Sequence, residues 1–187
     1  MTTIRTDRTQ RPFVMDEGIA LLARTPGTLD AMLRGLPDGW INANEGDSSW
    51  SPFDVVGHLI HGERTGWMPR VRIVLEHGEG RAFDTFDRFA QFAASEGRPL
   101  SSLLDEFATL RQDNLRELTA LRLTDADLDQ RGRHPVFGAV TLRQLLASWV
   151  AHDLDHVVQI SRVLARQYSS EVGPWVAYLR IISGQQG

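Results

Sequence analysis

The chain carries two histidines one helical turn apart, His152 and His156. Side chains at positions i and i+4 of a helix point the same way, with Cβ atoms about 5–6 Å apart, so two such imidazoles can bind one metal ion. Apolar residues recur around them at helical spacing and place both rings on or beside the inward face, where each needs a partner. The spacing predicts part of a metal site; the alternative is two hydrogen-bonded core histidines.

Asp153 follows His152, so the pattern differs from the His-Glu-x-x-His of zinc proteases and lacks their glutamate base. The acids Asp153 and Asp155 flank the pair, and acids in such positions are usually solvated. Cysteine is absent, so a further protein ligand must be histidine, a carboxylate or a carbonyl. Of the remaining histidines, His77 and His134 favour exposed positions, which leaves His58 and His61.

Length and composition predict a single globular domain of 187 residues, 42% hydrophobic and 24% charged. The net charge is −4 and no basic stripe is visible, so nucleic-acid binding is not expected. With neither cysteine nor lysine, disulfides, thiolate ligands and a lysine Schiff base are excluded. The N-terminus has no apolar core typical of a secretory signal, and no stretch matches a membrane span, so we expect a cytoplasmic protein. We expect its partner to be a small-molecule substrate.

The hydrophobic periodicity predicts an all-α fold, a four-helix bundle with short accessory helices. We expect a flexible tail over residues 1–12 and one helical-bundle domain over 13–187. The main helices are predicted at about 13–36 with a break at Pro26, at 52–77 with a bend at Pro69, at 100–120 and at 141–167. Shorter helices are predicted within 84–94, 124–128 and 174–182, and residues 134–140 are predicted to form a loop.

Two of these helices have strong start signals. Ser51 precedes Pro52 and is followed three residues later by Asp54, which is typical of a helix N-terminus. Thr141 and Gln144 form a capping box before the helix that carries the histidine pair. Both candidate ligand helices therefore begin at well-defined residues.

The stretches 50–63 and 138–156 together resemble the DinB-like superfamily, a group of metalloenzymes with a four-helix bundle. The resemblance covers nearly the whole chain after the tail. It implies a long crossover between the second and third helices and a divalent metal, most often zinc or nickel. Carried over by position, the metal ligands are His58, His152 and His156. The resemblance also implies, for some relatives, a low-molecular-weight thiol such as bacillithiol or mycothiol.

The periodicity of the second helix places His58 nearly opposite its apolar stripe, whereas Glu63 lies on that stripe. Either this helix is covered on two sides, or His58 reaches a groove at the end of the bundle. His61 is the alternative ligand, and Glu63 either accepts an imidazole N–H or pairs with an arginine. The small residues Gly62 and Gly66 share the face of His58 and would leave room for a metal and a substrate.

A helix that faces inward on two sides would suit a second subunit, and closed two-fold dimers are the commonest soluble assembly. We therefore expect a homodimer.

Three histidines leave at least one coordination position open, as in catalytic metal sites. We expect the chain to be a metal-dependent enzyme that acts on a small molecule, with an activity like that of a thiol S-transferase or a hydrolase. The alternative is a non-catalytic metal-binding or stress-response interaction protein. Three arginines could hold a substrate carboxylate or be surface charge: Arg64, Arg70 and Arg72. With ordinary histidine pKa values near ~6.5, metal affinity should fall between about pH 6 and 5.

Overall fold

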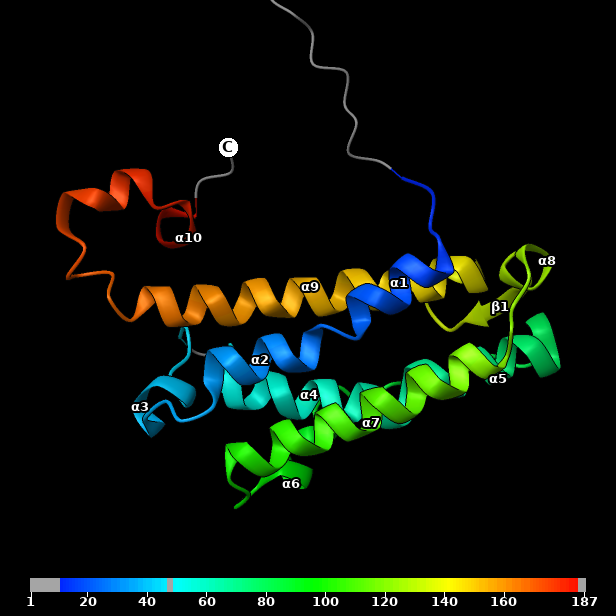
Figure 1. Cartoon of the computed structure of the whole chain (residues 1–187), viewed down its shortest axis with the longest axis horizontal. Coiled ribbons are helices and arrows are strands. Elements are labelled where there is room, and N and C mark those ends of the chain that lie inside the picture. The colour runs from blue at the N-terminus through cyan, green and yellow to red at the C-terminus, as the bar shows by residue number, and fades with distance from the viewer. Residues whose placement is uncertain (1–10, 47–48, 185–187) are drawn as a thin grey trace, which may run out of the picture.

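The computed structural model describes residues 11–46 and 49–184 and contains the expected four-helix bundle (Figure 1). Its main helices are α1 (Met15–Leu22) with α2 (Thr25–Leu33), α4 (Pro52–Thr65) with α5 (Trp67–His77), α7 (Leu100–Ala120) and α9 (Leu142–Arg166). The short ones are α3 (Asp38–Ile41), η1 (Gly78–Gly80), α6 (Ala90–Ser95), α8 (Asp125–Leu128), η2 (Gly173–Tyr178) and α10 (Arg180–Ser183). Residues 1–10 of the predicted tail lie outside the described residues, so the domain boundary stays a prediction.

The second helix is broken one turn earlier than predicted. The structure ends α4 at Thr65 and begins α5 at Trp67, with Gly66 between them, rather than bending at Pro69. Pro69 has no N–H to offer the carbonyl of Thr65, and its ring would clash with that turn, so the helix ends before the clash. Within α5, Pro69 lies in the first turn, where no intrahelical N–H is required.

The helix α4 is enclosed by other parts of the same chain. It packs against α7, α6, α5 and α9, and it is buried around most of its circumference, with His58 on one side and Ile60 on another. A Cβ on Gly57 would lie 2.5 Å from Ser95 Oγ, so the absence of a side chain there lets α6 lie directly on α4. The second helix is therefore covered on two sides by its own chain, and the homodimer, which rested on a second subunit providing that cover, stays a prediction.

Residues 131–141 form an antiparallel hairpin, β1 (Arg131–His134) and β2 (Gly138–Thr141), where a loop was predicted over 134–140. His134 pairs with Gly138, whose φ of 73° lies in the left-handed region that glycine adopts without strain. The long crossover between α5 and α7 is hydrogen-bonded to this hairpin: the Phe83 N–H donates to the Arg133 carbonyl at 2.9 Å. Strands of four residues are too short to show a period-2 pattern, which is why the sequence did not reveal them.

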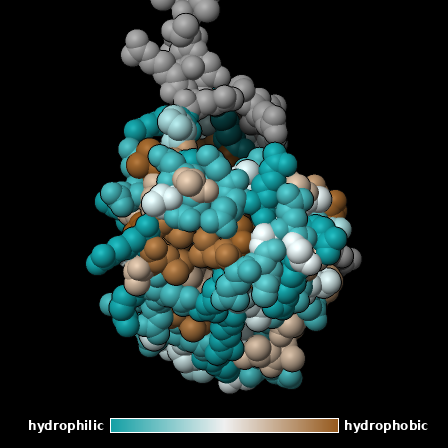
Figure 2. Space-filling view, turned by 90° about the vertical axis from the view of Figure 1, so that its right-hand side faces the viewer, coloured by the Kyte–Doolittle hydropathy of each residue, from teal (hydrophilic) through white to brown (hydrophobic). Residues whose placement is uncertain are grey.

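The hydrophobic core forms two clusters along the bundle, one around Trp67, Val71 and Trp149 and the other around Leu59 and Phe107. Viewed from the end that carries α8 and the hairpin, the surface is mostly hydrophilic, and the largest of its apolar patches lies in a hollow near the middle (Figure 2). None of the described helices is both long enough and apolar enough to span a membrane.

A buried ionic network joins three of the main helices. Arg111 of α7 donates to Glu63 Oε1 of α4 at 2.7 Å and to Asp153 Oδ2 of α9 at 2.6 Å, and all three side chains are at most 1% exposed. Arg111 also donates to the Leu22 carbonyl at the end of α1, at 2.8 Å. Burial alone would lower the pKa of Arg111, but the two carboxylates raise it, so the guanidinium stays charged. One cation thus holds α1, α4, α7 and α9 in register.

Glu63 has two further donors. Trp149 Nε1 donates to Glu63 Oε1 at 3.2 Å, and Asn114 Nδ2 donates to Glu63 Oε2 at 2.9 Å. The carboxylate is thus satisfied on both oxygens by α7 and α9, as a buried charge requires. Glu63 is the ion-pair partner of an arginine and has no hydrogen bond to an imidazole among the described residues.

We predict that Arg111→Met lowers the free energy of unfolding by about 3–5 kcal/mol, because it leaves two buried carboxylates without their cation. The measurement is urea unfolding of the metal-free protein at neutral pH. Arg116→Met is the matched control on the same helix: Arg116 is 70% exposed and pairs only with Asp113, so its loss should cost less than about 1 kcal/mol. Equal unfolding midpoints for the two variants would contradict the role given to Arg111.

Candidate metal centre

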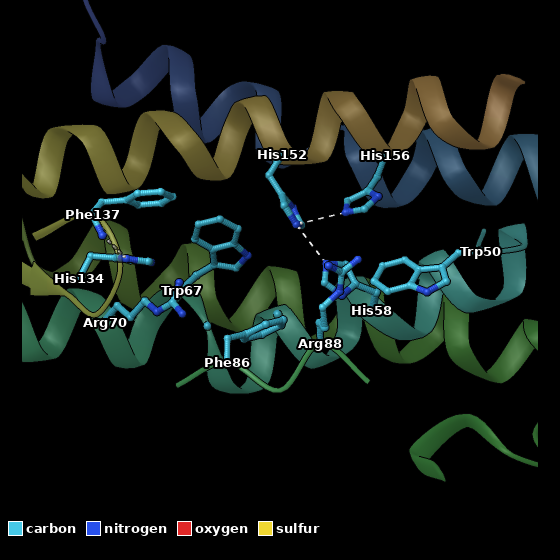
Figure 3. Close-up of a pocket in the computed structure, with 12 residues that line it drawn as sticks. Trp50, His58, Trp67, Arg70, Phe86, Arg88, His134, Phe137, His152 and His156 are labelled. Atoms are coloured by element: carbon cyan, nitrogen blue, oxygen red, sulfur yellow. Dashed lines mark hydrogen bonds between the residues drawn. The ribbon is translucent and has the colours of Figure 1, made fainter. Parts of the chain in front are cut away.

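The three candidate ligands meet between α4 and α9. His152 Nε2 lies 3.1 Å from His156 Nε2 and 3.2 Å from His58 Nε2, and the three ring nitrogens lie within 4.8 Å of one another. Figure 3 shows the rings turned toward a common point, His152 and His156 from α9 and His58 from the facing α4. The structure thus brings together the residues selected from the helical pair and the family resemblance.

Two of these three separations, those from His152, fit one shared ion. Imidazole nitrogens bind zinc at about 2.0–2.1 Å, so two ligands at angles of about 90–110° lie about 3.0–3.4 Å apart. The separations of 3.1 and 3.2 Å fall in that range. Neutral imidazoles are also the donor type that zinc, nickel, copper and iron accept. The donor set therefore fits a divalent transition metal.

Hydrogen bonding and ring packing orient the three candidate ligands. His156 Nδ1 lies 2.8 Å from Gln159 Oε1, and donation to that oxygen leaves the Nε2 lone pair free for a metal. The Nδ1 atoms of His58 and His152 are buried without a hydrogen-bond partner among the described residues. Aromatic rings hold these two instead: Trp50 packs on His58 at 4.8 Å between centroids, and Trp67 packs on His152 at 5.2 Å.

Burial keeps all three rings neutral. Burial, followed by the neighbouring histidines, lowers the pKa of His58 to about 3 and that of His152 to about 4. Burial also lowers the pKa of His156. Protons therefore compete with a metal only at a lower pH than the window of about 6 to 5 that ordinary histidine pKa values implied.

The other sequence candidates lie elsewhere. His61 faces Thr65, with His61 Nε2 3.3 Å from Thr65 Oγ1, and is not part of the cluster. Asp155 is exposed, as expected of a flanking acid, but Asp153 is 1% exposed and binds Arg111. Position alone could not separate these two acids, because the difference depends on the arginine brought by α7.

A cavity of about 570 Å³ opens beside the histidines. Gly62 and Gly66 form part of its wall, and a Cβ on Gly66 would lie only 2.9 Å from the Gly62 carbonyl. The remaining lining is mostly aromatic and cationic: Trp50, Trp67, Arg70, Phe86, Arg88, His134 and Phe137. The open side of the three-histidine cluster therefore faces a space large enough for a small molecule.

One residue of the cavity lining was predicted from the sequence to be exposed, and another was not identified. His134 was expected to be exposed in a loop, but the hairpin turns it into the cavity wall. Phe137 lies at the hairpin turn and also lines the cavity, although it is 75% exposed. No local signal could have revealed either one, because only the packing of the hairpin against the crossover brings them to the site.

A family model described as the DinB superfamily matches residues 21–160. The chain belongs to the DinB superfamily. Both halves of the candidate site, the His58 region and the His152/His156 pair, lie inside the matched range. No curated protein matches this DinB-superfamily chain.

Two solved structures are similar to it. YfiT from Bacillus subtilis, described as a probable metal-dependent hydrolase with an unusual four-helix bundle topology, has a TM-score of 0.72 and 22% identity. The alignment covers 84% of this chain and 92% of YfiT, and at this identity it shows the shared fold. TT2238, described as a four-helix bundle protein, has a TM-score of 0.47 and 21% identity over 77% of this chain and 95% of TT2238.

We predict that the metal-free protein becomes less stable as the pH falls from about 6.5 toward 4. Below the unfolded-state pKa of ~6.5 the unfolded chain binds protons that the buried rings do not, so stability present above that pH is lost on acidification. In this window each ring lowers the free energy of unfolding by up to about 1.4 kcal/mol for each pH unit of acidification. The measurement is urea unfolding across the pH range. In His58→Gln the free energy of unfolding should fall less steeply with pH than in the wild type. In His77→Gln, a change at an exposed site, it should fall as in the wild type. Parallel curves for all three proteins would contradict the prediction.

We predict that Gln159→Leu weakens metal binding by about tenfold or more, because His156 loses the acceptor that fixes its tautomer and orientation. Competition between the protein and a chromophoric chelator measures the affinity. Gln112→Leu, at an exposed position on α7, is the matched control and should bind metal like the wild type. Wild-type affinity in Gln159→Leu would show that this hydrogen bond does not support the site.

Proposed function

We propose that this protein is a metal-dependent hydrolase of a small molecule, with His58, His152 and His156 as the metal ligands. The observation that carries the proposal is the convergence of three neutral imidazole nitrogens at the edge of a cavity of about 570 Å³. The description of the structurally similar YfiT as a probable metal-dependent hydrolase supports the reaction class. Zinc or nickel is the proposed ion, since both accept an all-imidazole donor set.

A divalent ion in this position, when bound, acts as a Lewis acid and makes a coordinated nucleophile more acidic. The chain supplies the conditions for that chemistry. Burial keeps the ligand rings unprotonated, Gln159 orients His156, and Trp50 and Trp67 confine the other two rings. The aromatic wall shields one side of the site from water, and the glycines leave space for a substrate.

Thiol transfer is the second candidate, and the composition of the cavity favours it. Among the described residues, no carboxylate lines the cavity, so no acidic side chain is placed to act as a general base for water or to protonate a leaving group. A thiol that loses its proton on binding a metal needs neither. The chain has no cysteine, so the thiol would be a separate low-molecular-weight cofactor.

The first test is metal content, measured by plasma mass spectrometry on protein purified without a histidine tag. We expect about one ion per chain in the wild type, with a large loss in His58→Asn and His156→Asn. His61→Asn and His77→Asn are the matched controls and should keep the ion. Retention of the metal in His58→Asn, or its loss in His61→Asn, would overturn the ligand assignment.

The second test is turnover by the metal-loaded protein. Ester and amide substrates are assayed without thiol, and an electrophilic bimane is assayed with bacillithiol or mycothiol. Turnover that requires the metal and His156 supports the enzyme; dependence on added thiol selects transfer over hydrolysis. A loaded protein that is inactive in every assay favours the non-catalytic metal-binding role. The cytoplasmic location and the homodimer remain predictions alongside this proposal.

A further inference from the structure

The cavity beside the histidines continues into a second one. The second cavity has a volume of about 490 Å³ and is lined in part by β2 and the first turns of α9. Four residues line both spaces, namely Trp67, Arg70, His134 and Phe137. The two cavities are therefore neighbouring parts of one groove that leads from the histidines toward the hairpin, with these residues at the junction (Figure 3).

Arg70 is a half-buried cation at this junction without a counterion in contact. Several other arginines of the described residues also lack an ion pair, but those side chains are exposed. Arg70 has no hydrogen bond and no ion pair to a described residue; burial lowers the pKa of its guanidinium, and the charge of Asp84 acts on it from beyond ion-pair distance. A guanidinium offers five N–H donors, and burying such a group without an acceptor is unfavourable.

Aromatic rings position this guanidinium without using its donors. The central carbon of Arg70 lies 5.6 Å from the centroid of Phe83 and 5.8 Å from that of Phe86. These cation–π contacts attract the guanidinium to the rings, and none of its N–H groups donates to a described residue. The side chain is therefore held in place with its hydrogen-bonding edges available to a ligand.

His134 adds a second donor at the same place. The N–H groups of Val136 and Phe137 donate to His134 Nδ1 at 3.1 and 3.2 Å. An Nδ1 that accepts hydrogen bonds carries no proton, and burial together with Arg70 lowers the pKa of this ring, so the neutral ring carries its proton on Nε2. Figure 3 shows His134 next to Arg70 on the side of the groove away from the metal-site histidines.

We propose that Arg70 and His134 form an anion-binding subsite, so that the substrate is a small molecule with a carboxylate or phosphoryl group and an apolar segment. The anionic group binds at the junction of the cavities, and the apolar segment lies against Trp67 and Phe86 toward the histidines. Arg64 and Arg72, the other two sequence candidates, pair with Glu106 and Glu117 instead. That the bound molecule is a substrate rests on the proposed function; that an anion binds here does not.

The subsite is tested on metal-free protein, so that no anion can bind through a metal. Metal is removed with a chelating resin, and binding of phenylacetate, phenylphosphonate and neutral phenylacetamide is measured by calorimetry. The wild type should bind at least one of the anions more tightly than the amide, and Arg70→Gln should weaken that binding by about tenfold or more. The better of the two anions identifies carboxylate or phosphoryl recognition.

The matched control is Arg72→Gln, which makes the same change of charge two residues along α5, where the side chain pairs with Glu117. It should bind the anion like the wild type. Arg70→Lys should retain part of the affinity, and His134→Phe, which keeps a ring but removes both the Nε2–H and the Nδ1 acceptor of the hairpin turn, should lose about three- to tenfold. Circular dichroism and metal content of each variant show that the fold and the histidine cluster are intact.

Three results would overturn the subsite: equal affinities of wild type and Arg70→Gln for both anions, equal binding of the amide and the anions, or no anion binding up to about 10 mM. Each is independent of the metal assays. If the protein binds the anion but no metal, the proposed function is refuted and the subsite stands. If it binds metal and turns over substrate but does not bind the anions, the subsite is refuted and the proposed function stands.

Discussion

One buried guanidinium determines how the helices that carry the candidate ligands lie against each other. Arg111 is shared between Glu63 and Asp153, and each of these acids lies close in sequence to a candidate ligand: Glu63 follows His58 on α4, and Asp153 follows His152 on α9. A lateral or axial shift of either helix would break an ion pair where no water could replace it. The network therefore fixes the positions of the helix segments that carry the histidines.

Burial acts on the candidate site in two directions. Burial is unfavourable for polar atoms without hydrogen-bond partners, and this cost applies to the Nδ1 atoms of His58 and His152. The same burial lowers the pKa values of these rings, so that their lone pairs are available to a metal rather than to protons. Without a metal ion, this cluster of buried neutral donors makes the folded protein less stable. A bound cation restores that stability by mass action.

The surroundings of the cluster divide the cavity chemically. Near the histidines the wall is mostly aromatic, with Trp50, Trp67 and Phe86 and with Arg88 beside Trp50, whereas Arg70 and His134 bring donors to the junction with the second cavity. A ligand that satisfied both regions would be positioned along the groove before any reaction, which is how binding energy away from the reacting atoms contributes to catalysis.

Local signals in the sequence determined the helices and half of the candidate site. The caps at Ser51 and Thr141 and the apolar periodicity are decided within a few residues, and so is the inward direction of the pair His152 and His156. The third histidine followed from family resemblance, since its own periodicity pointed away. Only the tertiary structure decided that α6 covers the far side of α4, that Asp153 is buried in an ion pair with Arg111, and that a hairpin brings His134 to the groove. These depend on contacts between segments distant in sequence, whose free energy no local pattern records.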